Sequence, residues 1–298
     1  MNTTEIWTPP KLVQWISNDF SRRGFPPPHR LEAEQLVSFA LSISRLDLYL
    51  QYDRPCTKEE QTRLRKLVER RHTREPLAYI LQECDFWSMT LEVGPGVLIP
   101  RQDTEVLIEA ALEIIPNTIN DQSFSILELG TGSGAIPLAL CSERDNLFVV
   151  TIENSEKALQ FAIRNIDKYK QENQRKRNKI FPVLGNGFDF ISKQPIVDLM
   201  ISNPPYIPAK DIEHLQEEVA LWEPKTALNG GEKGLDFYEL LKSSAEIHLK
   251  TGGFLIFEHG YDQKLPIIDL MKTSESLTLE KAIKDYSKQD RVLVYQKK

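Results

Sequence analysis

The sequence has few cysteines, no long hydrophobic run and no leader-like start. Cys56, Cys84 and Cys141 are odd in number and widely spaced, which argues against a disulfide framework and against a zinc site. No apolar run reaches the roughly 18 residues of a membrane-spanning helix, and the first residues lack the basic start and apolar block of a signal peptide. We therefore expect a cytoplasmic protein with no bound metal and no membrane partner.

An excess of positive charge is absent too. The chain has 37 Lys and Arg residues against 43 Asp and Glu residues, which gives a formal net charge of −6. This balance argues against a large basic groove for nucleic acid. Of the 298 residues, 41% are hydrophobic and 27% are charged. Such a composition is typical of a globular protein, and the length is sufficient for two domains.

Residues 1–84 are predicted to form an N-terminal helical domain. We expect Thr8 to cap its first helix, and the capping box of Thr57 and Glu60 to begin a long third helix. The outer side of that helix is expected to carry the basic side chains Arg63, Lys66, Arg70, Arg71 and Arg74. A solvated face is the simpler interpretation of this row, and a docking surface for an acidic or RNA-bound partner is the alternative.

Residues 85–100 are predicted to be a β-hairpin that links two domains, with strands at 86–93 and 97–100. Residues 101–298 alternate between strand and helix patterns, which predicts an α/β domain with a doubly wound, mainly parallel, Rossmann-like sheet. Its strands are expected near 124–129, 147–152, 180–184, 196–202 and 253–258. Ligands of such sheets bind at the carboxyl ends of the strands.

The predicted strand 196–202 ends at Asn203, Pro204, Pro205 and Tyr206. Because proline fixes φ and has no N–H, the backbone after Asn203 is stiff and cannot continue a ladder. The Asn203 side-chain oxygen and the Pro204 carbonyl remain as acceptors, with an aromatic ring close by. This arrangement suits a planar group that carries an NH₂.

A second motif lies upstream, where the strand 124–129 runs into a turn that contains Gly130, Gly132 and Gly134. Glycines let a backbone approach a ligand closely, and the helix that follows favours an anionic group at its N-terminus. Glu153 ends the next strand, at a spacing typical of an acidic residue that holds a ribose diol. By itself, the turn also fits a nicotinamide dinucleotide fingerprint.

Together, the two motifs resemble S-adenosylmethionine-dependent methyltransferases that act on a planar amino or amide nitrogen. Further matching stretches are residues 70–78, 86–88, 98–105, 223–228, 252–260 and 285–291. On these stretches the chain is similar to the peptide chain release factor glutamine N5-methyltransferases, which modify the Gly-Gly-Gln loop of translation termination factors. The segment Asp103-Thr104-Glu105 favours this family over the related enzymes for a ribosomal large-subunit protein.

The resemblance implies a catalytic and substrate-binding centre at Asn203, Pro204, Pro205 and Tyr206. It also implies S-adenosyl-L-methionine as cofactor, S-adenosyl-L-homocysteine as product, and release factors as protein partners of a monomeric enzyme with no nucleic-acid requirement. The residues expected to bind the cofactor are Glu128, Gly130, Thr131, Gly132, Gly134, Glu153, Asn186, Thr104, Phe86 and Trp87. Asn186 departs from the aspartate that the family has near the adenine, but its amide oxygen can still accept from an amino group.

Two other functions compete with this one. An adenine-N6 methyltransferase would grip an exocyclic amine with the same Asn-Pro-Pro-Tyr stretch, and a cofactor-binding scaffold would recruit a translation factor without chemistry. The acidic charge balance argues against the first, and the retention of Asn203 and of the glycines argues against the second. Thr104 and Glu105 are expected to cap a helix, to contact the cofactor or to close the site. His259 is expected to have a structural role.

Overall fold

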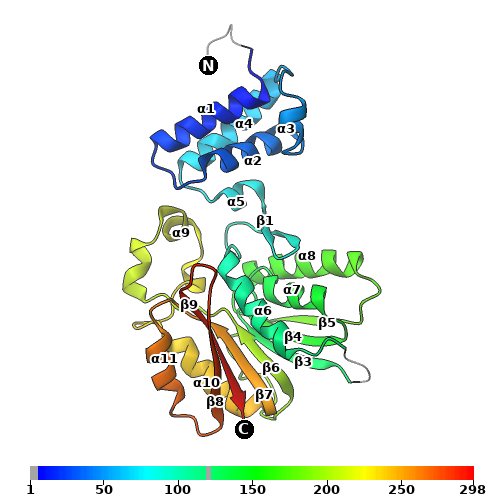
Figure 1. Cartoon of the computed structure of the whole chain (residues 1–298), viewed down its shortest axis with the longest axis vertical. Helices are drawn as coiled ribbons and strands as arrows, with labels where there is room; N and C mark the ends of the chain where they lie inside the picture. Colours follow the sequence, from blue (N-terminus) through cyan, green and yellow to red (C-terminus); the bar gives the residue numbers. More distant parts are fainter. Residues whose placement is uncertain (1–5, 119–121) are drawn as a thin grey trace. The chain divides into compact units, whose positions relative to one another are not determined.

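The computed structural model describes residues 6–118 and 122–298, and the chain divides into two compact units, Met1–Gln82 and Glu83–Lys298 (Figure 1). The hairpin lies within the second unit. Its end is fixed there because the Glu92 N–H donates to Asn165 Oδ1 at 2.7 Å and Asn165 Nδ2 donates back to the Glu92 carbonyl at 3.0 Å.

The first unit is helical, as the sequence predicts. Its helices are α1 (Pro9–Arg22), α2 (His29–Leu41), α3 (Asp47–Leu50), α4 (Lys58–His72) and α5 (Leu77–Leu81). Their apolar faces form one core, which includes Leu12, Ile16, Phe20, Leu36, Leu64 and Ile80. The capping box of Thr57 and Glu60 at the start of α4 is confirmed. Thr8 occupies the N-cap position and Pro9 begins the helix, as expected, but the Thr8 side chain makes no capping hydrogen bond.

The predicted basic face of α4 is only partly correct. Arg71 is 2% exposed, and its guanidinium donates to the Glu32 carboxylate at 3.1 Å. Arg70 donates twice to Glu75, at 2.9 and 2.6 Å. A guanidinium paired with a carboxylate inside its own unit is less available to a partner. The outward basic side chains of the predicted set on α4 are therefore Arg63 and Lys66, both exposed.

The hairpin of the second unit lies earlier in the chain than its sequence predicts. Its strands are β1 (Glu83–Phe86) and β2 (Met89–Glu92), and Phe86 pairs with Met89. The chain turns at Trp87, whose φ of 55° is left-handed. Residues 97–100 form no strand, because the Ile99 N–H donates instead to the buried Glu223 carboxylate at 3.2 Å.

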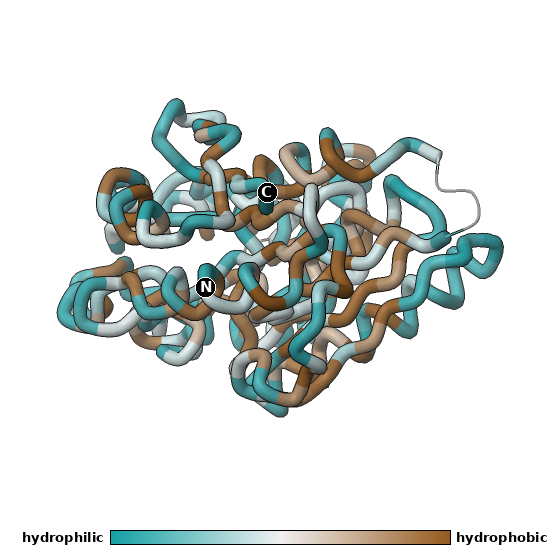
Figure 2. Tube along the Cα trace, turned by 90° about the horizontal axis from the view of Figure 1, so that it is seen from below, coloured by the Kyte–Doolittle hydropathy of each residue, from teal (hydrophilic) through white to brown (hydrophobic). Residues whose placement is uncertain are grey.

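The predicted doubly wound sheet is confirmed. Its strand order is β5-β4-β3-β6-β7-β9-β8, in which β3 to β7 run parallel and β9 pairs antiparallel with both β7 and β8. The strands are β3 (Phe124–Leu129), β4 (Leu147–Glu153), β5 (Lys179–Leu184), β6 (Val197–Ser202), β7 (Leu249–Glu258), β8 (Leu277–Lys284) and β9 (Asp290–Lys297). In Figure 2 the hydrophobic colours follow the strands, and hydrophilic colours predominate in the outer connections.

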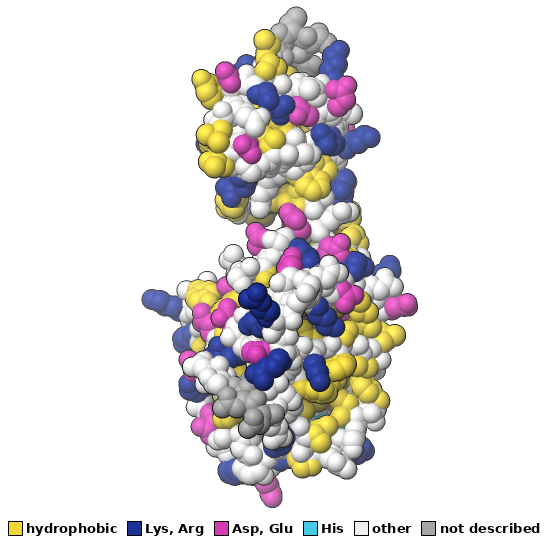
Figure 3. Space-filling model, turned by 90° about the vertical axis from the view of Figure 1, so that its right-hand side faces the viewer, with side chains coloured by type: hydrophobic (Ala, Val, Ile, Leu, Met, Phe, Trp, Pro, Cys, Tyr) yellow, Lys and Arg dark blue, Asp and Glu magenta, His cyan; other side chains and the backbone are white. Residues whose placement is uncertain are grey.

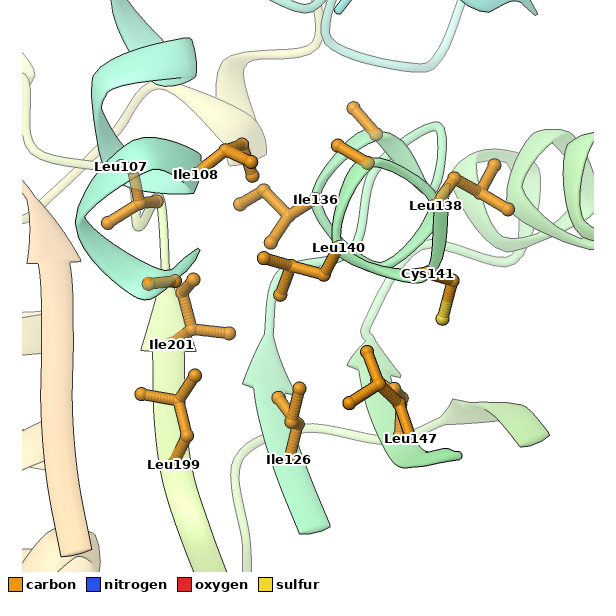
Figure 4. Packing of buried hydrophobic residues seen from close by; sticks show 14 of the residues in the cluster. Leu107, Ile108, Ile126, Ile136, Leu138, Leu140, Cys141, Leu147, Leu199 and Ile201 are labelled. Carbon is orange, nitrogen blue, oxygen red and sulfur yellow. The ribbon is translucent and has the colours of Figure 1, made fainter. Parts of the chain in front are cut away.

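Helices cover both faces of this sheet (Figure 1). One face packs against α6 (Glu105–Ile114), α7 (Ala135–Glu143) and α8 (Glu156–Glu172), and the other packs against α10 (Asp236–His248) and α11 (Lys264–Met271). Figure 4 shows the first core, where Leu107 and Ile136 lie above Ile126 and Ile201. The shorter elements are η1 (Gln102–Thr104), η2 (Ala209–His214), α9 (Glu217–Trp222) and η3 (Lys225–Ala227). Within the described ranges, no helix has the length and apolar character of a membrane span.

Candidate active site

The carboxyl ends of the parallel strands bring the chemistry-bearing residues to one edge of the sheet. Leu129 pairs with Ser202, and Ser202 pairs with Phe257. The residues that follow these partners, among them Asn203 and Glu258, therefore lie side by side. Ligands of parallel α/β sheets bind at this edge.

The glycine turn after β3 has a backbone that only glycine adopts readily. Gly130, Gly132 and Gly134 have φ values of 78°, 55° and 85°, in the left-handed region that disfavours a Cβ. Glu153 at the end of β4 holds the turn, because its carboxylate accepts from the N–H groups of Gly132 and Ser155, both at 2.9 Å. The acidic residue predicted to meet a ribose thus also fixes the turn.

A cavity lies between the turn and the end of β6. Six of its lining residues are expected from the sequence to bind the cofactor or the substrate at this edge: Gly130, Gly132, Glu153, Asn186, Asn203 and Pro205. Leu129, Ile152 and Phe237 supply apolar walls. A nucleoside-containing ligand needs a glycine cradle, an acceptor for its hydroxyls and apolar walls for its base. The residues present therefore fit an adenosyl group.

The side chain of Asn203 is held from behind. Its Nδ2 donates to Thr104 Oγ1 at 3.0 Å, and that hydroxyl donates to Glu258 Oε2 at 2.7 Å. Thr104 is 4% exposed and Glu258 is 1% exposed. Burial raises the pKa of the Glu258 carboxyl to about 7, although the bond from Thr104 acts in the opposite direction. The Asn203 amide thus turns its nitrogen inward, and the oxygen faces the other way.

The tyrosine of the motif points to the same carboxylate. The Tyr206 hydroxyl lies 3.4 Å from Glu258 Oε1, and burial raises the pKa of that phenol. Its backbone carbonyl accepts from Gln263 Nε2 at 2.8 Å. The ring of Tyr206 packs against the core under α10. Contact between this ring and a substrate amide stays a prediction.

Comparison with known proteins agrees with this geometry. Residues 11–81 match a family model described as the PrmC N-terminal domain, and residues 104–235 match the methyltransferase small domain. A release factor glutamine methyltransferase from Geobacter sulfurreducens is 39% identical over 89% of this chain and 89% of its own length. One from Thermodesulfovibrio yellowstonii is 38% identical over 89% of this chain and 92% of its own.

The chain belongs to the release factor glutamine methyltransferase family. Among solved structures, the hMettl16 catalytic domain, in complex with a MAT2A 3'UTR hairpin, superposes with a TM-score of 0.54 over 80% of this chain and 81% of its own. The two sequences are 14% identical, so this likeness concerns the fold alone. It agrees with the Rossmann-like methyltransferase sheet.

Several residues expected to bind the cofactor in this methyltransferase do not line the cavity. Phe86 is 1% exposed and belongs to the core under α6 and α7, and Trp87 Nε1 donates to Glu143 Oε1 at 2.8 Å. Neither ring lines the cavity, so their contact with the cofactor stays a prediction. Their motif closes the hairpin and anchors it, since the Trp87 N–H also donates to Glu105 Oε1 at 3.0 Å.

Other expected cofactor residues lie in the turn or beneath it and do not line the cavity. Glu128 is fully buried and accepts from the Thr151 hydroxyl, and burial raises the pKa of this carboxyl to about 7. Thr131 is buried as well, and Gly134 caps α7. Contact of these residues with the cofactor stays a prediction. Thr104 makes no capping bond for α6 and instead contacts Asn203. His259 is fully buried, as a structural residue would be.

Sequence reasoning missed the residues that shape the loop after the motif. Gly230 and Gly234 pack directly on it, because a Cβ would lie 2.8 Å from the Pro205 carbonyl oxygen and 2.3 Å from the Tyr206 carbonyl oxygen. Gln263 Nε2 donates to the carbonyl oxygens of both Tyr206, at 2.8 Å, and Gly234, at 3.1 Å, and so links the two segments. The signal in the sequence is the run of glycines at 230, 231 and 234, which indicates close backbone approach.

A buried glutamate, Glu223, also escaped prediction as a site residue. It is 5% exposed, accepts from the Ile99 N–H and forms an ion pair with Arg101. Leu98 and Pro224, the neighbours of these residues, both line the cavity. Glu223 therefore joins two segments of the cavity wall that lie more than a hundred residues apart in the chain.

Proposed function

We propose that this protein transfers a methyl group from S-adenosylmethionine to the side-chain amide of the glutamine in the Gly-Gly-Gln loop of peptide chain release factors. The observation that supports this most directly is the orientation of Asn203. Its nitrogen is bound to Thr104, so its oxygen is left for an N–H of the substrate, in the cavity that the glycine turn also lines. The family supports the choice of substrate.

The chain's contribution to this reaction is mainly orientation. A glutamine amide nitrogen is a weak nucleophile, because its lone pair is delocalised into the carbonyl. The Asn203 oxygen and the Pro204 carbonyl would each accept one N–H of the amide and so hold its nitrogen in place. Oriented reactants gain about 7–11 kcal/mol over free ones. The nitrogen becomes acidic as its new N–C bond forms, so the proton it loses can pass to water without a strong base.

The cofactor end of the cavity supplies the second reactant. When bound, S-adenosylmethionine provides the methyl group, and its C–S bond breaks with the electron pair left on sulfur. Glu153 would hold the ribose and Asn186 the adenine amino group, while the glycine turn gives the backbone room to approach. We propose that no metal takes part. Across residues 6–118 and 122–298, no cluster of acidic, His and Cys side chains is arranged to hold one.

Purified release factor, with radiolabelled cofactor, is the substrate for the decisive experiment. We expect label on the glutamine of the Gly-Gly-Gln loop, and none after that glutamine is changed to glutamate, because no NH₂ remains to be gripped. DNA, RNA and a ribosomal protein serve as competing substrates. Labelled adenine in nucleic acid, with an unlabelled release factor, would replace this proposal by the adenine-N6 alternative.

Docking of the release factor is proposed to involve the first unit and the hairpin. Lys and Arg side chains alternate with Asp and Glu on the face of the molecule that Figure 3 shows, in both units. A mixed surface of this kind favours a protein partner over a nucleic-acid backbone, which needs a continuous basic footprint. We further propose that the enzyme acts as a monomer in the cytoplasm.

A further inference from the structure

We infer that Thr104 and Glu258 are positioning residues, which hold the Asn203 amide with its oxygen toward the substrate. The inference rests on the proposed function, because it explains how the proposed acceptor is oriented. It assigns a role to two buried residues that the proposed chemistry itself does not use.

The direction of each hydrogen bond decides the orientation of the amide. A threonine hydroxyl has one proton, and that of Thr104 is donated to Glu258 Oε2 at 2.7 Å. The hydroxyl can then only accept from its other neighbour. An NH₂ group satisfies it, and Asn203 Nδ2 lies at 3.0 Å. If the Asn203 oxygen took the place of Nδ2, it would face a lone pair of the Thr104 hydroxyl, and no proton would lie between the two oxygens.

A proton on Glu258 would reverse the chain of bonds. Protonated Glu258 could donate to Thr104 Oγ1, and the Thr104 proton would then be free to bond the Asn203 oxygen. The amide could turn over and present its NH₂ to the cavity. Since an NH₂ group only donates, it cannot accept the N–H of a substrate amide. The charge of Glu258 therefore controls whether Asn203 is an acceptor.

The surroundings of Glu258 make this change accessible near neutral pH. Burial raises its pKa to about 7, and Asp103 raises it further, whereas Thr104, Arg291 and the Tyr206 hydroxyl lower it. Tyr238 from α10 donates to the Glu258 backbone carbonyl at 3.2 Å. His259, the next residue, is buried, and burial lowers its pKa. Arg291 is itself shared between Asp285 at 2.9 Å and Asp103 at 3.4 Å.

The first test removes the hydroxyl of Thr104. We expect kcat of Thr104→Val to fall about 10- to 100-fold, the range for one lost polar contact in a transition state, with an unchanged Kd for S-adenosylmethionine. Thr104→Ser keeps the hydroxyl and should retain most of the activity. Thr278→Val is the matched control, because it removes a buried hydroxyl without a hydrogen-bond partner from β8, at the far edge of the sheet. Wild-type kcat in Thr104→Val would overturn the inference.

The second test follows the charge of Glu258. In the wild type, kcat/KM should fall about tenfold per pH unit below the pKa of this group, with cofactor binding measured at each pH. Glu258→Gln has no proton to gain, so its activity should be intermediate and lack this acidic limb. A flat wild-type profile between pH 6 and 8 would overturn the inference, even if every variant failed to fold.

The two proposals fail in different ways. A wild-type enzyme that does not label the release factor glutamine at any pH would remove the proposed function. A wild type that labels it, together with an acidic limb that persists in Glu258→Gln, would leave the function intact and remove the relay through Thr104 and Glu258.

Discussion

Two buried glutamates lie beneath the two motifs that border the cavity, and they differ in what they support. Glu128 lies beneath the glycine turn and Glu258 lies beneath the Asn203 motif. Each is fully or almost fully buried, accepts from a threonine hydroxyl, and has its pKa raised to about 7 by burial.

The difference lies in the threonine. Thr151 is the direct register partner of Glu128 in the neighbouring strand, so this pair is part of the ladder between β3 and β4. Thr104 comes from η1, 154 residues before Glu258, and passes the contact on to Asn203. The Glu128–Thr151 pair therefore joins two neighbouring strands, whereas the Glu258–Thr104 pair contacts Asn203, whose side chain faces the cavity.

The comparison implies that the cofactor end is fixed by backbone and the substrate end by side chains. At the cofactor end, positive φ values and a carboxylate on backbone N–H groups fix the turn. At the substrate end, the orientation of one amide depends on where two protons reside. A change at the substrate end should thus alter chemistry and leave cofactor binding intact, and the reverse should hold at the other end.

The largest effect is expected from Asn203→Ala. It removes the proposed acceptor, so methyl transfer should fall at least about a hundredfold, since one oriented contact in a transition state is worth roughly 2.7–4 kcal/mol. Cofactor affinity by calorimetry should change little. Asn203→Asp sharpens the test: it keeps an oxygen but loses the donor to Thr104, so we expect a nearly inactive enzyme. Wild-type labelling by Asn203→Ala would show that the motif is not the catalytic centre.

Removal of the first unit should also separate cofactor binding from methylation of the release factor. A chain that begins at Glu83 retains the sheet, both of its cores and the cavity. We expect it to bind S-adenosylmethionine with ordinary affinity but to methylate the intact release factor at least about tenfold more slowly, because docking contacts are lost. A short Gly-Gly-Gln peptide is the control substrate, on which both lengths should perform alike. Full activity on the intact factor would contradict the docking role.

Much of the site could be predicted from sequence, because its motifs are contiguous. The glycine turn, Glu153 and Asn203 each lie at the carboxyl end of a strand, and the edge of the sheet brings these ends together. Thr104 was a candidate for a cap or for a cofactor contact, but its link to Glu258 depends on how η1 folds across the end of the sheet. No local pattern carries a contact between residues so far apart.

The fold was missed where local patterns mislead. Strand β8 is largely exposed, so it shows no apolar alternation and was not predicted. The hairpin was placed too late in the chain, because the segment with Gly94 and Gly96 looks like a turn. The real turn is at Trp87, a residue that rarely adopts a positive φ. Tertiary packing of the hairpin against α8 decides this case.

At the cofactor end, Glu153→Ala should weaken binding of S-adenosylmethionine by about 1–3 kcal/mol, the range for leaving polar partners unmatched. The variant loses the acceptor for the Gly132 and Ser155 N–H groups, as well as the proposed ribose contact. Glu156→Ala, at an exposed position just after it, is the control. Calorimetry with unchanged affinity for Glu153→Ala would mean that the ribose is held elsewhere. With saturating cofactor, kcat should stay near that of the wild type.

The smallest effect on catalysis is expected from Glu128→Gln, whose consequence is for stability. The pKa of Glu128 is about 7 in the folded protein, against an ordinary value of 4.5. The folded state therefore binds more protons than the unfolded state between these values, so the free energy of unfolding falls as pH rises from 4.5 through 7. At about 1.4 kcal/mol per pKa unit, this fall amounts to about 3 kcal/mol.

Glutamine stays neutral at every pH. Glu128→Gln should therefore lose the part of the pH dependence of the unfolding free energy that is due to Glu128, and keep the similar part that is due to Glu258. Hydrogen exchange of the β3 and β4 amides, followed from pH 5 to pH 8 after correction for the intrinsic rate, reports the stability of the second unit. Exposed Glu156→Gln should show the wild-type slope. An equal pH dependence of stability in Glu128→Gln and the wild type would show that Glu128 does not change its charge in this range. Glu128 and Glu258 would then differ in their titration as well as in their contacts.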